Sequence, residues 1–174
     1  LTQEQAEEAR RLNTLPKHVE EAIASDTNRN RQILSAVRDL DQDWTAILFA
    51  ASVSHAEQMA ALLNFEGVPS AVISAQTDQP ARRHYIREFN RGAIRVLCNY
   101  GVLTEGFDAP SVRAVIVGRP TFSPNVYQQM VGRGLRGPLN GGKRECLIIN
   151  VADNILQFGG QLAFRHFDYL FDGQ

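Results

Sequence analysis

The chain has 174 residues, of which 44% are hydrophobic and 21% charged, and its formal net charge is −1. This composition supplies one buried core of ordinary domain size and excludes a chain that is disordered along its whole length. No apolar run approaches the roughly 18 residues that a membrane-spanning helix needs, so we expect no membrane partner.

The charges are unevenly distributed along the chain. Residues 1–45 hold nine acidic and six basic side chains, whereas no acid occurs between Asp108 and Glu145, where six basic residues lie. Sixteen of the 18 cationic side chains are arginines, whose planar guanidinium suits paired hydrogen bonds to phosphate or carboxylate. We therefore expect one end of the folded domain to be locally positive.

Cys98 and Cys146 both lie inside short apolar runs, and neither has a second thiol or a histidine at the spacing of a metal ligand. They predict small buried side chains in a reducing compartment. We therefore expect a cytoplasmic location and no metal ligands in this chain.

Residues 1–43 are polar, charged and helix-prone, and Pro16 divides them into two predicted helical stretches. We expect this segment to be a lead-in that packs against an upstream domain or links to it. The chain starts at Leu1 without an initiating Met, which favours a piece of a longer protein. Residues 44–174 are expected to form one domain.

From Trp44 onward, short apolar runs alternate with amphipathic segments. The runs predict five strands, at residues 46–50, 71–73, 94–98, 114–117 and 146–149. Helical spacing of apolar residues predicts helices that begin at Ser54, at Asp78 with Pro80, and at Ser123, and another at residues 162–171. Near-continuous apolar strands separated by helices are typical of an α/β fold with a parallel sheet covered on both faces. Ligands of such sheets meet the loops at the carboxyl ends of the strands.

Two glycine-rich patterns point to other classes of protein. Residues 137–144 resemble a P-loop, but Arg144 stands where Ser or Thr is needed for magnesium, and the segment leads into a strand instead of leaving one. Residues 132–137 form a GxGxxG pattern, yet Pro138 and further glycines follow where a dinucleotide fingerprint needs a helix. A surface loop is favoured for the first pattern. An NAD(P)-binding oxidoreductase remains an alternative for the second.

The segment from Gln129 to Arg136 carries two arginines three positions apart. This spacing places two guanidinium forks on one side of a helix end, where each can donate charge-assisted hydrogen bonds to phosphate. A nucleoside triphosphate is the obvious ligand. The segment resembles motif VI of superfamily 2 helicases and translocases. That resemblance implies that Arg133 and Arg136 reach the γ-phosphate of ATP held by another domain, with Gln129 and Gly132 beside the nucleotide.

The run from Thr104 to Pro110 follows a predicted strand and resembles motif V of the same helicases. The resemblance implies that Thr104 touches a nucleic-acid phosphate and that Gly106 and Asp108 line the ATP cleft. A glycine turn with an Asp cap is the structural alternative. The position of this run one strand before Gln129 favours the helicase interpretation.

Two further nucleic-acid contacts follow from looser resemblances. Residues 47–52 resemble motif IV, which implies that Ser52 lies beside the nucleic-acid path, whereas His55 is interpreted as a helix-start residue and not as a catalyst. Arg82 stands seven residues before Phe89, as an arginine does in the family, so a structural or phosphate-contacting role is expected. The neighbouring row at positions 83, 87 and 91 favours a solvated helix face.

Together these resemblances imply the second RecA-like domain of a superfamily 2 helicase, a fold of the P-loop NTPase type without its own P-loop. The run Thr-Glu-Gly-Phe-Asp and the run Gln-Met-Val-Gly-Arg are most similar to the type III restriction Res subunit and related repair helicases, which favours DNA over RNA.

The expected protein is the C-terminal half of an ATP-dependent DNA helicase or translocase. ATP would be bound with Mg²⁺ held by an N-terminal RecA-like domain, and this fragment alone would not hydrolyse ATP. A catalytically silent regulatory or interaction module is a further alternative.

Overall fold

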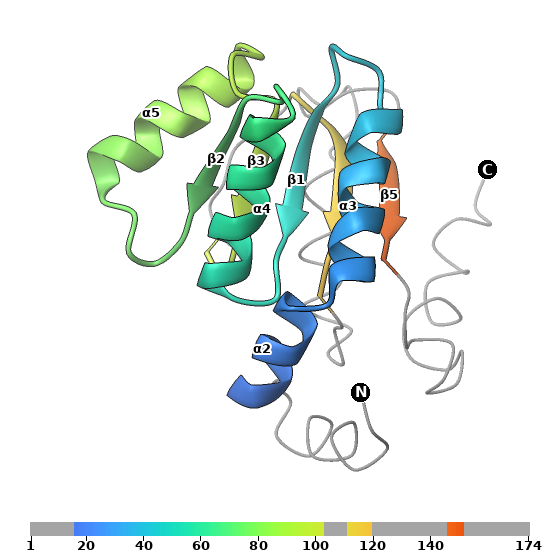
Figure 1. Cartoon of the computed structure of the whole chain (residues 1–174). Helices are drawn as coiled ribbons and strands as arrows, with labels where there is room; N and C mark the ends of the chain where they lie inside the picture. The colour runs from blue at the N-terminus through green and yellow to red at the C-terminus, as the bar shows by residue number, and fades with distance from the viewer. Residues whose placement is uncertain (1–15, 103–110, 120–145, 152–174) are drawn as a thin grey trace, which may run out of the picture.

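A computed structural model describes residues 16–102, 111–119 and 146–151, and the structural statements below refer to this part of the chain (Figure 1). Its helices are α2 (Lys17–Ala24), α3 (Thr27–Asp39), α4 (Val53–Phe65) and α5 (Gln79–Asn90). Its strands are β1 (Thr45–Phe49), β2 (Ser70–Ile73), β3 (Val96–Asn99), β4 (Val112–Val117) and β5 (Leu147–Asn150).

The five strands form one sheet in the order β2-β3-β1-β4-β5, and every neighbouring pair is parallel. All five predicted strands are confirmed, each within two residues of its expected bounds. Strand β1 lies at the centre, and all five of its residues are buried. A parallel sheet with a fully buried central strand requires cover on both faces.

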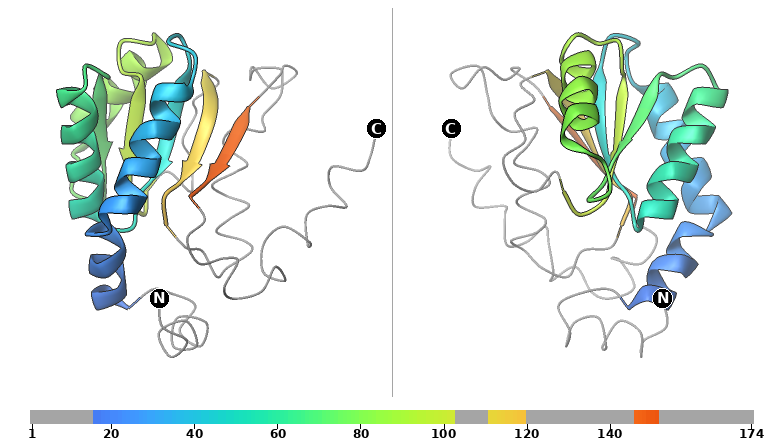
Figure 2. Two further views of the ribbon diagram at one scale, coloured as in Figure 1. Left: turned by 45° about the vertical axis from the view of Figure 1, so that its right-hand side comes forward. Right: turned by 90° about the vertical axis from the view of Figure 1, so that its left-hand side faces the viewer.

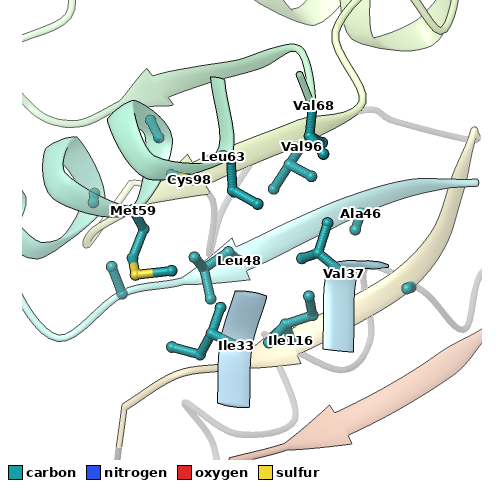
Figure 3. Close-up of a cluster of buried hydrophobic side chains, with 14 of the residues drawn as sticks. Ile33, Val37, Ala46, Leu48, Met59, Leu63, Val68, Val96, Cys98 and Ile116 are labelled. Atoms are coloured by element: carbon teal, nitrogen blue, oxygen red, sulfur yellow. The ribbon is translucent and has the colours of Figure 1, made fainter. Parts of the chain in front are cut away.

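The two faces of β1 belong to two separate clusters of buried side chains. Ala46 and Leu48 pack in the cluster that contains the apolar residues of α3 and α4 (Figure 3). Ile47 and Phe49 point the other way, into the cluster that contains Phe89 of α5. Figure 2 shows α3 and α4 on one side of the sheet and α5 on the other. The expected cover on both faces is therefore confirmed.

Helix α3 is an integral part of this core. Ile33 and Val37 of α3 are fully buried and pack in the same cluster as Leu48 of β1 and Ile116 of β4 (Figure 3). The sequence before residue 44, expected to be a lead-in, thus supplies one layer of the core. A boundary at residue 44 would cut through this cluster.

The single helical stretch predicted after Pro16 is wrong. The chain forms two helices there, because the carboxylate of Asp26 accepts hydrogen bonds from the backbone amides of Asn28 at 2.9 Å and Arg29 at 3.1 Å. This capping starts a new helix one residue after Ser25 ends the previous one.

The other helix starts follow the same physical rule. Asp78 caps α5 through the amide of Ala81 at 2.7 Å, with Pro80 in the first turn, as predicted. The expected start of α4 at Ser54 is wrong by two residues, because Ser52 accepts the hydrogen bond from the His55 amide at 3.0 Å. Ser52 is therefore the capping residue.

We expect Ile33→Ala to lower the free energy of unfolding by about 2–5 kcal/mol, because it opens a cavity between α3 and the sheet. Urea unfolding followed by circular dichroism measures this difference. Phe65→Ala is the control, since its side chain is 90% exposed and its loss should cost less than about 0.5 kcal/mol. A cost for Ile33→Ala as small as that of the control would show that α3 does not belong to the core.

Candidate functional site at the carboxyl edge of the sheet

The carboxyl ends of the central strands are aligned at one edge of the sheet. Backbone hydrogen bonds extend the sheet past the strand ends: Ala50 donates to the Asn99 carbonyl at 2.8 Å, and Gly118 donates to the Phe49 carbonyl at 3.0 Å. The exits of β1, β3 and β4 therefore lie side by side. This is the edge at which parallel α/β sheets bind ligands.

Two of the predicted site residues lie in the described part of the chain, namely Ser52 and Arg82. The others lie outside the described residues: Thr104, Gly106, Asp108, Gln129, Gly132, Arg133 and Arg136. In sequence, Val102 lies shortly after β3 and precedes Thr104, Gly106 and Asp108. Arg119 lies shortly after β4 and precedes the group at positions 129, 132, 133 and 136. Both connections start from the carboxyl edge.

Ser52 follows the carboxyl end of β1, as expected for a residue at this edge. Its hydroxyl oxygen is engaged as the cap of α4. The side chain is half-buried, and its hydroxyl proton is not required by that cap. A contact between Ser52 and nucleic acid stays a prediction.

Arg82 ties α5 to the segment that follows β2. Its Nη2 donates to the carbonyl of Ser74 at 3.0 Å, and Ser74 is itself buried. Its Nε is buried and has no hydrogen-bond partner among the described residues. These contacts support the structural half of the expected role, and the phosphate contact stays a prediction.

The arginine row of α5 is exposed to solvent, in agreement with its interpretation as a solvated face. Arg87 and Arg91 share one carboxylate, that of Glu88, at 3.1 Å and 3.6 Å. The hydrogen bond from Arg87 is the main cause that lowers the pKa of Glu88. Two guanidinium charges against one carboxylate leave this face with an excess of positive charge.

The acid-free stretch does not place all its charge at one end. Of its basic residues the structure describes Arg113 and Arg119, which lie at opposite ends of β4. The guanidinium of Arg113 stacks 4.5 Å from the ring centroid of Trp44, whereas that of Arg119 lies 5.7 Å from the ring of Tyr100. Of these two described residues, Arg119 is the one whose positive charge lies near the carboxyl edge.

His55 is the centre of a buried polar chain that the sequence did not reveal. Its Nδ1 accepts the amide proton of Ala51 at 3.1 Å, so its Nε2 carries the ring proton and donates to Oδ1 of Asn30 at 2.8 Å. The Asn30 amide in turn donates to the carbonyl of Ala24 at 2.9 Å. This chain joins the exit of β1 to α3 and to the end of α2.

Burial and the nearby Arg29 charge lower the pKa of His55 to about 4. The ring is therefore neutral at physiological pH, which suits it to hold a backbone amide and not to act as a general acid. The expectation that His55 is not a catalyst agrees with this geometry. Spacing alone gave no signal of its partners, because Asn30 is 25 residues away in the sequence.

Two further polar contacts connect the N-terminal helices to this edge. Nη1 of Arg29, whose side chain is 1% exposed, donates to the carbonyl of Gly118 at 2.7 Å. The hydroxyl of Tyr100 donates to Oε1 of Glu20 at 2.6 Å. Burial, with the Glu20 carboxylate beside it, raises the pKa of Tyr100 to about 12, so the phenol stays protonated.

Among residues 16–102, 111–119 and 146–151, no three His, Cys, Asp or Glu side chains gather as metal ligands. No helix in the same ranges has the length and apolar character needed to cross a membrane. Burial raises the pKa of the thiols at Cys98 and Cys146, to about 12 and about 11, which keeps both protonated.

Residues 28–137 match the model of the Helicase conserved C-terminal domain family, and the chain belongs to this family. The match includes the GxGxxG pattern at residues 132–137, so the oxidoreductase alternative is not favoured. It starts within α3, in agreement with the place of that helix in the core.

Curated relatives include ATP-dependent helicases of two yeasts. The chain is 34% identical over 106 residues to the putative ATP-dependent helicase IRC3 of Saccharomyces cerevisiae, which covers 61% of this chain and 15% of the relative. It is 35% identical over 111 residues to the putative mitochondrial ATP-dependent helicase irc3 of Schizosaccharomyces pombe, and this match covers 64% of this chain and 18% of the relative. The chain thus spans less than a fifth of the length of these relatives.

Solved structures show the same fold. The C-terminal domain of the DEAD-box protein Dbp5 superposes with a TM-score of 0.63 at 22% identity, covering 77% of this chain and 80% of that chain. The Hef helicase domain of Pyrococcus furiosus superposes with a TM-score of 0.57 at 22% identity, and the match covers 84% of this chain and 28% of that chain. The expected RecA-like fold is confirmed.

We expect the stability of the domain to fall as the pH drops from 7 to 4. Because folding lowers the pKa of His55 from 6.5 to about 4, the neutral ring contributes stability above pH 6.5 that is lost as the unfolded chain binds the proton. The expected loss from this residue is on the order of 3 kcal/mol.

Urea unfolding at a series of pH values measures this slope. His55→Gln should flatten the pH dependence between pH 6.5 and pH 4, whereas His18→Gln, at an exposed position of α2, should leave it unchanged. Equal slopes for the wild type and His55→Gln would contradict the assigned protonation state.

Proposed function

We propose that this chain is the C-terminal motor domain of an ATP-dependent DNA helicase or translocase. The observation that carries the proposal is the family match over residues 28–137, which includes both the motif V-like run at 104–110 and the motif VI-like run at 129–136. The names of the two yeast relatives, both ATP-dependent helicases, support ATP as the energy source.

The proposed mechanism divides the ATP site between two domains. An N-terminal RecA-like domain would hold ATP and its Mg²⁺, while Arg133 and Arg136 of this chain donate to the γ-phosphate as negative charge develops in the transition state. Gly106, Asp108, Gln129 and Gly132 would line the nucleotide cleft. Closing and opening of the two domains would move the protein along the nucleic acid. The exits of β3 and β4 at one edge support this arrangement, because each leads in sequence toward one of these groups.

The nucleic-acid partner is proposed from charge and position. Helix α5 holds three arginines and one glutamate, whereas α4 on the opposite face of the sheet holds one glutamate and no arginine or lysine. Thr104, Ser52 and Arg82 would contact mainly the phosphates of the nucleic acid.

DNA is proposed over RNA because of the Thr-Glu-Gly-Phe-Asp run and the resemblance to the Res subunit. The DBP10 relatives, in contrast, are named RNA helicases. The cytoplasmic location stays a prediction.

We expect Arg136→Ala in the full-length protein to leave ATP binding intact and to slow ATP hydrolysis by up to ~10³-fold, the scale of other arginine fingers. Arg136→Lys should not restore turnover, because an ammonium keeps the charge but loses the planar fork. Single-turnover hydrolysis and melting temperature are measured on one preparation. A variant with a lower melting temperature and normal turnover would remove Arg136 from the catalytic site.

We expect single-stranded DNA to stimulate ATP hydrolysis by the full-length protein more than RNA of the same sequence and length. Thr104→Val should weaken this stimulation more than the basal rate, because it removes a phosphate contact and leaves the nucleotide site intact. Steady-state ATPase assays at several salt concentrations measure both effects. Equal or stronger stimulation by RNA would overturn the choice of DNA.

A further inference from the structure

The N-terminal helices contact the carboxyl edge through buried polar groups and not only through apolar packing. Arg29 reaches the carbonyl of Gly118, and the Asn30–His55 pair holds the amide of Ala51. Burying a guanidinium is unfavourable unless its hydrogen bonds fix it in place. A buried arginine aimed at a strand exit therefore indicates a positional role.

Gly118 makes this contact in a tightly packed place, where a side chain would force its neighbours to shift. A Cβ at Gly118 would lie 3.0 Å from Cδ1 of Leu48, 3.1 Å from the carbonyl oxygen of Phe49 and 3.2 Å from Cδ1 of Ile33. The backbone after β4 thus passes in close contact between β1 and α3. Its amide is bound to Phe49 and its carbonyl to Arg29, so both polar groups of this peptide segment are fixed.

The two polar connections form one unit. Arg29 holds the exit of β4, and Asn30 holds the exit of β1 through His55. Both connections start from adjacent residues at the beginning of α3, where Asp26 caps the helix. The position of this one helix end therefore sets the position of two strand exits.

We infer that Arg29 is a positioning residue of the motor: it fixes the chain at Gly118 and Arg119, from which the sequence continues to Arg133 and Arg136. The inference rests on the proposed function for its effect on turnover. Its structural half, that Arg29 holds the exit of β4, stands independently of that function. A misplacement of catalytic groups by about 1 Å is sufficient to cost about 10²-fold in rate.

The test compares Arg29→Met, which keeps the volume and removes the donor and the charge, with Arg31→Met on the same helix. Arg31 is exposed and donates a hydrogen bond to the side chain of Asn28 on the same helix, so it is a matched control. In the full-length protein Arg29→Met should lower the turnover of nucleic-acid-stimulated ATP hydrolysis by about tenfold or more. The KM for ATP should change less than about twofold, because the other domain holds the nucleotide in the proposed mechanism.

Two more variants separate position from folding. Arg29→Lys keeps the charge and a donor nitrogen that can bind the Gly118 carbonyl, so it should restore most of the turnover. Gly118→Ala keeps Arg29 but displaces the β4 exit, so it should reproduce the low turnover. Unchanged turnover per folded molecule in Arg29→Met, or no recovery with Lys, would overturn the assignment.

Amide hydrogen exchange gives a readout that does not need activity. In Arg29→Met the amides of Gly118 and Ala51 should exchange faster, while those of β2 and β3 stay protected. Uniformly faster exchange would overturn the local role of Arg29. If Arg29→Met shows this local pattern but the wild-type protein hydrolyses no ATP, the proposed function is contradicted and the structural half of the inference is supported.

Discussion

Burial of β1 on both faces is the constraint on which the rest of this domain depends. A central parallel strand exposes no residue to water, so α3 and α4 must cover one face and α5 the other. At the carboxyl end of that strand the apolar pattern stops and backbone groups must find polar partners inside the protein. After β1 the amide of Ala51 donates to His55, whose ring is held by Asn30 of α3, and after β4 the carbonyl of Gly118 accepts from Arg29 of the same helix. The apolar side of α3 also packs against the sheet.

The order of strands and helices could be predicted from the sequence, because buried strands and helix faces require local patterns of apolar residues. Five apolar runs marked the strands, and Asp78 with Pro80 marked the start of α5 as the structure has it. The break between α2 and α3 was not anticipated, although its signal is local: Asp26 caps amides only two and three residues further along the chain. The place of α3 was missed for another reason. Its apolar positions are few, and Arg29 and Asn30 made a buried helix look like a solvated one.

The candidate site shows the same division between local and non-local information. Ser52 was expected beside the nucleic-acid path and Arg82 in a structural or phosphate-contacting role. In the structure Ser52 caps α4 just after β1, and Arg82 binds the carbonyl of Ser74 just after β2. His55 was set aside for lack of a catalytic partner, and its real partners are a backbone amide and an asparagine from another helix. The spacing of a motif identifies ligand-binding residues that are close to one another in the sequence. It gives no signal for side chains that folding brings together from distant parts of the chain.

The contact between Arg29 and Gly118 also bears on how the chain folds as it is made. Its two residues are 89 positions apart, so at a synthesis rate of about 5–20 residues per second α3 would wait roughly 4–18 s for its partner strand. During that interval Ile33 and Val37 have no β4 to pack against, and the guanidinium of Arg29 remains in water. The nascent helix is thus a surface that other apolar chains can contact. Transiently exposed apolar surface of this kind is what makes incompletely folded chains prone to aggregation, the hazard that chaperones counter.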